Sequence, residues 1–100
     1  DNTDMDQQQA VDEIRTIIRS HLPDPAYQMF LFGSRAAGHA RKFSDIDIGI
    51  EGPTPIAGSV LFGIEEDLEE SDIPYIVEVV DFTAVADSFG QFARRHSNLL

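Results

Sequence analysis

The sequence predicts an α/β fold in which helices pack on a small mixed β-sheet of three to four strands. Segments with apolar residues at helical spacing alternate along the chain with short apolar or strictly alternating segments, which are typical of strands. The 100 residues are 42% hydrophobic and 25% charged, as expected for one globular core. We therefore expect a single domain over residues 1–100, with residues 1–5 disordered or foreign to the native chain.

The beginning of the chain predicts a helix followed by a strand. Apolar residues three and four apart predict a helix from about Asp6 to His21, and Pro23 stops it. The mostly apolar run Tyr27–Phe32 (YQMFLF) predicts a buried strand that ends at Gly33. A helical turn over residues 34–38 is expected to follow.

The next segment, Asp45–Ile50 (DIDIGI), alternates strictly between isoleucines and polar or small residues. A strand turns successive side chains to opposite faces, so we expect Asp45, Asp47 and Gly49 on one face. The three isoleucines then pack the other face into the core. This strand is thus expected to have one buried side and one polar side.

The second half of the chain predicts a helix, a strand and another helix. Thr54 as N-cap and Pro55 as the first helical residue are expected to open a helix from about Ile56 to Glu70. The run Tyr75–Val80 (YIVEVV) predicts a third strand, and Thr83 is expected to cap a final helix. The inner face of the middle helix is expected to carry Val60, Leu61, Ile64 and Leu68.

The charge of the chain disfavours several classes of partner. Seven Lys and Arg residues against 18 Asp and Glu residues give a net charge of −11, which repels nucleic-acid backbones and anionic membranes. No apolar run approaches the roughly 18 residues of a membrane span. The absence of cysteine excludes disulfides and thiolate metal sites. We expect a cytoplasmic protein without direct membrane or nucleic-acid binding, in which a phosphate substrate meets a metal ion or the basic residues Arg35, Arg41 and Lys42.

Asp45 and Asp47 are the candidate metal ligands. Two carboxylates on one face of a strand, roughly 5 Å apart, repel each other by a few kcal/mol unless solvent or a cation screens them. Such oxygen ligands suit magnesium, which completes its shell with water and substrate phosphate. The pair Gly33-Ser34 at the end of a strand lets backbone and hydroxyl donors approach a phosphate. Each feature alone is ordinary, a solubilising pattern or a turn, but their combination at this spacing is specific.

The segment LFGSRAAGHARKFSDIDIGI, residues 31–50, resembles the signature of the DNA polymerase β-type nucleotidyltransferase superfamily, in particular its minimal nucleotidyltransferase branch. The resemblance implies that Asp45 and Asp47 are catalytic and bind two Mg²⁺ ions. It also implies a nucleoside triphosphate at the preceding turn, with these nucleotide-binding residues: Gly33, Ser34, Arg35 and Ser44. Ala37 departs from the family pattern, in which many members have arginine, so another cation must supply that charge.

The resemblance further implies a third acid on a later strand, and the segment YIVEVVDF offers Glu78 or Asp81. Strand alternation puts these two carboxylates on opposite faces. If Val77 and Val79 pack inward, Glu78 lies on the face expected for the acid. We therefore predict Glu78 as the third catalytic and metal-binding residue, with Asp81 as the alternative. Relatives usually have Asp here, and the extra methylene of Glu changes the reach of the carboxylate.

The activity implied by the resemblance is Mg²⁺-dependent transfer of a nucleoside monophosphate, AMP from ATP, to an acceptor hydroxyl. In the minimal branch the acceptor is a tyrosine of a HEPN-type helical toxin, whose antitoxin this protein would then be; a homodimer is left open. The alternative is a weak or inactive antitoxin subunit that binds nucleotide or partner, which Ala37 and Glu78 favour. Transfer to an antibiotic ranks lower, because the larger relatives that catalyse it carry an extra domain.

Overall fold

The computed structural model describes residues 5–33, 45–84 and 98–100. Its elements in chain order are α1 (Gln7–His21), β1 (Gln28–Phe32), β2 (Ile46–Glu51), α2 (Gly58–Glu70), β3 (Val77–Asp81), the 3₁₀ turn η1 (Phe82–Ala84) and β4 (Asn98–Leu99). The strands form one sheet in the order β3-β2-β1-β4. Since β2 is antiparallel to β1 and parallel to β3, the sheet is mixed, and the predicted fold class is confirmed.

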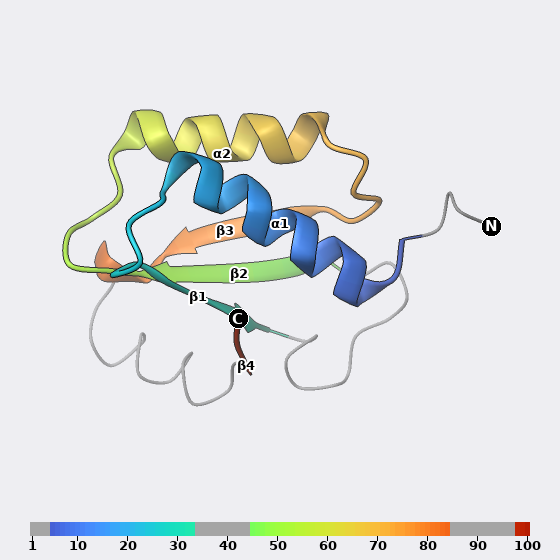
Figure 1. Ribbon diagram of the computed structural model, residues 1–100, viewed down its shortest axis with the longest axis horizontal. Coiled ribbons are helices and arrows are strands. Elements are labelled where there is room, and N and C mark those ends of the chain that lie inside the picture. Colours follow the sequence, from blue (N-terminus) through green and yellow to red (C-terminus); the bar gives the residue numbers. More distant parts are fainter. Residues whose placement is uncertain (1–4, 34–44, 85–97) are drawn as a thin grey trace.

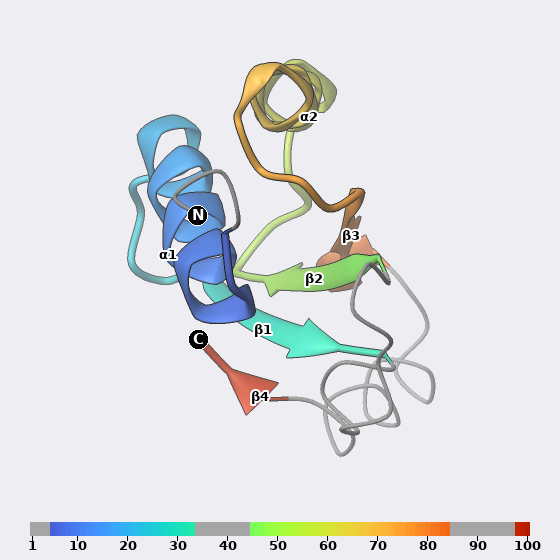
Figure 2. The ribbon, with the colours of Figure 1, turned by 90° about the vertical axis from the view of Figure 1, so that its right-hand side faces the viewer.

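Both described α-helices lie on one face of the sheet (Figure 1, Figure 2). In the end-on view of Figure 2, α1 lies over β1, and α2 lies on the side of the sheet that carries β3. No helix in the described ranges is long and apolar enough to cross a membrane. The helical turn expected at residues 34–38 and the helix expected after Thr83 lie outside the described residues.

The first helix begins where the sequence predicts, because Asp6 forms a capping box with Gln9. The Asp6 carboxylate accepts from the Gln9 backbone N–H at 2.8 Å, and the Gln9 side chain accepts from the Asp6 N–H at 2.9 Å. These bonds satisfy two donors that a helix leaves unpaired at its start. Near the other end, Arg19 donates to backbone carbonyls of the turn into β1, those of Leu22, Asp24 and Tyr27.

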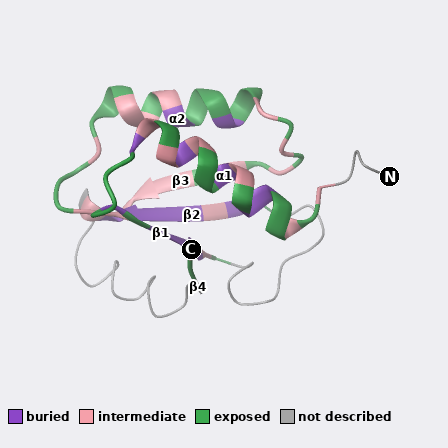
Figure 3. Ribbon diagram, in the orientation of Figure 1, coloured by how far each residue is buried: buried purple, intermediate pink, exposed green. Residues whose placement is uncertain are grey.

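The helix-facing side of the sheet forms the main core. Ile46, Ile48 and Ile50, alternate residues of β2, are completely buried there. They belong to one cluster with residues of both helices and β1, including Ile14, Ile18, Met29, Leu31, Ile64 and Leu68. Figure 3 shows the buried positions along β2 and α1. Because each fully buried isoleucine contributes about 1.5–3 kcal/mol, this face supplies most of the stability of the described fold.

The other side of the sheet, which we call the open face, faces away from α1 and α2 and holds a small aromatic cluster. Phe30 and Phe82 stack with ring centroids 5.2 Å apart, and Phe32 meets Phe82 edge-on at 5.1 Å. A Cβ added to Gly49 would overlap the rings of Phe30 and Phe82. Glycine therefore lets the two rings lie directly against the backbone of β2.

The second helix begins later than the sequence predicts. Its first residue is Gly58 and its N-cap is Ala57, which makes no side-chain capping bond. The expected cap at Thr54, with Pro55 as the first helical residue, is therefore wrong. Of the expected inner face, Ile64 and Leu68 are buried, whereas Val60 and Leu61 are only half-buried.

Long-range hydrogen bonds explain why this segment is not helical. The Tyr27 hydroxyl donates to the carbonyl of Thr54 at 2.7 Å and lies 3.0 Å from its side-chain oxygen. The backbone N–H of Ile56 donates to the Asp81 carboxylate at 2.8 Å. Because Tyr27, just before β1, and Asp81 of β3 bind these groups, local capping preferences are overridden.

The strands at the two edges of the described sheet also refine the prediction. β3 is shifted toward the C-terminus relative to the predicted run, and Tyr75, which precedes it, donates its hydroxyl to the Met5 carbonyl at 3.0 Å. Met5 also packs against the main core. At the other edge, β4 adds a two-residue strand in a segment for which the sequence predicts no strand.

Candidate active site

Asp47 lies in the middle of the described sheet. The antiparallel register pairs it with Phe32 of β1, and the parallel register pairs it with Glu78 of β3. Because Ile46 and Ile48 are buried under the helices, the side chain between them projects to the open face. Asp47 is half-buried there, and Asp45, just before β2, is exposed.

Glu78 lies beside Asp47 on the open face. Its neighbours Val77 and Val79 pack against the main core, so strand alternation turns Glu78 to the other side, where it is exposed. The geometry on which the prediction of Glu78 rests is thus present in the structure. Its chemical role stays a prediction.

Asp81, the alternative third acid, is engaged elsewhere. It pairs with Ile50 at the end of β3, and one carboxylate oxygen accepts from the Ile56 N–H at 2.8 Å. The other oxygen accepts from the Thr83 N–H at 2.9 Å. These bonds join the loop before α2 to the turn after β3, so Asp81 serves the fold.

The environment of the open face shifts the pKa of Asp47. Burial raises the pKa of the Asp47 carboxyl above its ordinary value of 3.8, and the negative charges of Glu78 and Asp45 raise that pKa further. A raised pKa means that the protein disfavours the charged carboxylate as it stands. A bound cation would reverse that balance, because it favours the charged form.

Gly33 brings the turn after β1 against this carboxylate. Its φ angle is 78°, a left-handed conformation that glycine adopts easily and other residues rarely do. A Cβ added to Gly33 would also overlap an oxygen of Asp47. The backbone conformation therefore requires glycine, and the backbone at Gly33 lies against the Asp47 carboxylate. Three of the predicted nucleotide-binding residues lie outside the described residues: Ser34, Arg35 and Ser44.

The described residues fit a metal ion in part. Asp47 and Glu78 are neighbours on adjacent strands, and carboxylate oxygens are the donors that magnesium prefers. Within residues 5–33, 45–84 and 98–100, however, no group of three or more acidic, histidine or cysteine side chains is arranged to hold an ion. Asp47 with Glu78 therefore offers a partial ligand set, which water and substrate phosphate would have to complete.

The arrangement of a strand-borne acid, a neighbouring acid and a glycine turn agrees with a comparison to known families. A family model described as the nucleotidyltransferase domain matches residues 11–96 of this chain. The chain belongs to the nucleotidyltransferase domain family. The matched range includes Gly33, Asp45, Asp47 and Glu78, so all the described candidate residues of this nucleotidyltransferase domain lie within it.

A curated relative supports the same assignment. The probable protein adenylyltransferase MntA of Haemophilus influenzae is 32% identical to this domain over 82 residues, which are 82% of this chain and 70% of that protein. The domain is thus a nucleotidyltransferase, as the sequence predicts. Its place in the minimal branch of the polymerase β-like superfamily is confirmed as well.

Two solved structures share the fold. A chain from the crystal structure of a toxin–antitoxin with AMP-PNP has a TM-score of 0.70 at 20% identity, covering 88% of this domain and 69% of that chain. A chain from the complex of the tri-AMPylated Shewanella oneidensis HEPN toxin with the MNT antitoxin has a TM-score of 0.67 at 19% identity, covering 93% and 70%. At this identity the likeness establishes the fold.

Sequence reasoning missed the aromatic support of the open face. Phe30, Phe82 and Gly49 are buried on the same side of the sheet as Asp47, whereas the run YQMFLF predicts only a buried strand. The alternation of this run could have predicted the aromatic cluster, because Met29 and Leu31 face the helices and Phe30 and Phe32 face the other way.

Proposed function

We propose that this nucleotidyltransferase domain transfers AMP from ATP to an acceptor hydroxyl in a Mg²⁺-dependent reaction in the cytoplasm. The observation that carries the proposal is the pairing of Asp47 with Glu78 on the open face, with Gly33 against the Asp47 carboxylate. Two acids from adjacent strands form an oxygen-rich site beside a turn whose backbone can approach a phosphate.

Each residue has a distinct role in the proposed reaction. Asp45 and Asp47, with Glu78, would hold magnesium, whose charge would offset the negative charge on the triphosphate. The Gly33–Ser34 turn, with Arg35 and Ser44, binds phosphate oxygens. The acceptor oxygen forms a bond to the α-phosphorus as the bond to the bridging oxygen breaks, and pyrophosphate leaves. Glu78 takes the proton of the acceptor hydroxyl.

The proposed acceptor is a tyrosine of a HEPN-type helical protein. Two likenesses support it: to a probable protein adenylyltransferase, and to a chain of a complex between an MNT antitoxin and a tri-AMPylated HEPN toxin. This domain spans about 70% of the length of both relatives. A protein acceptor also fits the negative charge of the chain, since a template of nucleic acid would be repelled.

A second candidate is an antitoxin subunit that binds nucleotide or partner without turnover. It is supported by Glu78 in place of the usual aspartate and by the exposure of that side chain. The absence of a three-ligand group within the described residues also favours it. The two candidates differ in chemistry, so a transfer assay separates them.

Two measurements test the proposal. Calorimetry should detect ATP binding with magnesium and much weaker binding with EDTA, because without metal the phosphates meet carboxylates in a protein of net charge −11. Incubation with ATP labelled in its α-phosphate and a HEPN-type protein should then label that protein. Equal ATP affinity in magnesium and EDTA would refute the metal bridge. Metal-dependent binding without any labelling would favour the subunit without turnover.

A further inference from the structure

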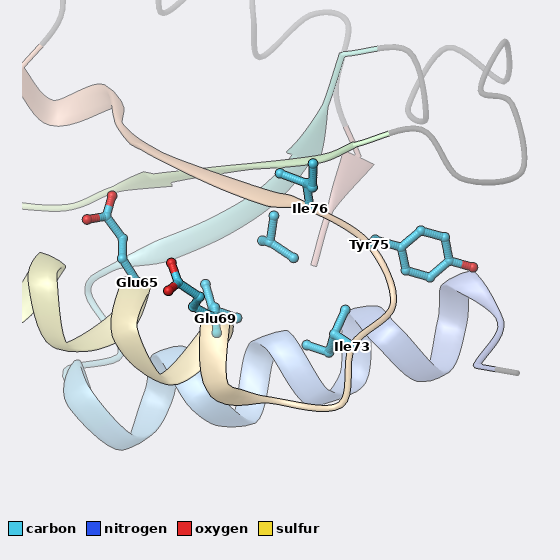
Figure 4. A pocket seen from close by; sticks show the side chains of 7 residues that line it. Glu65, Glu69, Ile73, Tyr75 and Ile76 are labelled. Carbon is cyan, nitrogen blue, oxygen red and sulfur yellow. The ribbon is translucent and has the colours of Figure 1, made fainter. Parts of the chain in front are cut away.

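A cleft of about 500 Å³ lies between α2 and the chain that leads into β3. Its lining combines acidic and apolar side chains: Glu65, Leu68, Glu69, Ile73, Tyr75, Ile76 and Val77. We call it the α2–β3 groove. Figure 4 shows the side chains of Glu65 and Glu69 projecting from α2 toward the segment that carries Ile76. A cleft of this size is large enough to receive several side chains.

Ile76 makes the groove unusual for a surface. Its side chain is 68% exposed, although it directly precedes β3, and it is one of three large hydrophobic residues exposed among those described. β3 is also the outer strand on its side of the described sheet. An exposed apolar side chain next to a sheet edge is typical of a surface that binds another chain.

The charged side chains that line the groove are two glutamates, Glu65 and Glu69. The ion pairs found in the described part of the chain are Arg15 with Asp12 and His21 with Asp67, so neither Glu65 nor Glu69 is paired with a cation there. The last turn of α2 contains no basic residue. Like charges beside the apolar side chains of one cleft complement a ligand with Lys or Arg beside a large apolar side chain.

The groove also lies at the end of the sheet where the candidate active site begins. The Ile46 N–H donates to the Ile76 carbonyl at 2.9 Å, and Asp45 directly precedes Ile46. Within β3, Val77 lines the groove and the next residue, Glu78, turns to the open face. A chain bound in the groove would therefore be held next to the strand ends that carry the three acids.

We propose that the α2–β3 groove binds a basic amphipathic helix of the acceptor protein, with an apolar side chain against Ile76 and Lys or Arg side chains facing Glu65 and Glu69. The inference rests on the proposed function in taking the bound protein to be the acceptor. The groove then supplies the second binding surface that a small transferase needs to hold a protein substrate beside its active site.

The test uses a synthetic 14-residue amphipathic helix of leucine and lysine, labelled for fluorescence anisotropy and titrated with the protein in the absence of nucleotide. Reversing both groove charges, Glu65→Lys with Glu69→Lys, should weaken binding at least about tenfold. The matched control, Glu66→Lys with Glu70→Lys, makes the same charge change at exposed positions of α2 that do not line the groove. It should weaken binding by no more than about threefold.

A further variant tests the apolar contact without changing charge. Ile76→Ser should weaken peptide binding by about threefold or more, with an unchanged melting temperature, because the side chain is exposed in the unbound protein. Equal weakening by the two charge reversals, or no effect of Ile76→Ser, would refute specific binding in the groove. Either result would leave only non-specific attraction between the peptide and the protein. Because these titrations contain no ATP, their result does not depend on whether the protein transfers AMP. ATP affinity in magnesium should be unchanged in Ile76→Ser and equal in the two charge-reversal variants, which carry the same net charge.

Discussion

Alternate residues of β2 meet two different environments. Ile46, Ile48 and Ile50 are completely buried under the helices, whereas Asp47 is half-buried on the open face between Phe32 and Glu78. One face therefore contributes stability, and the other carries the charges that the proposed chemistry needs. Substitutions at neighbouring positions of this strand should therefore affect different properties, stability on the buried face and nucleotide transfer on the open face.

The largest effect is expected for Asp47→Asn. Loss of the charge that holds the metal should lower AMP transfer by about a thousandfold or more, since metal stabilisation of the transition state is worth several kcal/mol. The melting temperature without metal should stay the same or rise, because the substitution removes repulsion from Glu78 and Asp45. Single-turnover assays measure the loss of AMP transfer, and thermal melts measure the change in melting temperature. A large loss of stability in metal-free buffer would make Asp47 a structural residue.

The next effect separates the two candidate third acids. Glu78→Gln should lower turnover by about a hundredfold or more with ATP binding kept, since a general base contributes about that much. Asp81→Asn should leave turnover near the original at low temperature but destabilise the fold by about 1–2 kcal/mol, because the amide keeps only one of the two oxygens that accept from the Ile56 and Thr83 N–H groups. Kinetics and denaturant unfolding on both variants make the comparison. The opposite ranking in turnover would assign the role to Asp81.

On the buried face, Ile48→Ala should lower the free energy of unfolding by about 2–5 kcal/mol, because it leaves a cavity in the main core. The control is Phe62→Ala on α2, whose side chain is 64% exposed and whose loss should cost less than about 0.5 kcal/mol. Urea unfolding measures both. Similar losses for the two variants would contradict a core centred on β2.

The smallest expected effect is the pH dependence of the Asp47→Asn stabilisation. The pKa of Asp47 is raised in the folded state by burial and by Glu78 and Asp45, so its charged form costs stability at neutral pH. The variant should therefore gain up to about 1 kcal/mol near neutral pH in metal-free buffer, a modest amount because the carboxyl is partly exposed. The gain should shrink as pH falls through the raised pKa and disappear below the ordinary value of 3.8. A gain that stays constant down to acid pH would exclude this charge as its cause.

Much of the site follows from local sequence. The alternation in DIDIGI places three isoleucines in the core and Asp47 on the opposite face, and both placements agree with the structure. Of the predicted phosphate-binding turn at residues 33–34, the structure describes only Gly33. Its φ of 78° explains why a glycine follows β1. The roles of Ser34, Arg35 and Ser44 stay predictions.

By itself the sequence determined the first helix, through apolar residues at helical spacing, and the two-sided character of β2, through strand alternation. The tertiary structure decided features that depend on residues far apart in the chain. Parallel pairing of β2 with β3 puts Glu78 rather than Asp81 beside Asp47. Hydrogen bonds from Tyr27 and to Asp81 delay the start of α2, against its local signals. The α2–β3 groove likewise exists only once helix and strand are packed, because non-local contacts have no periodicity in the sequence.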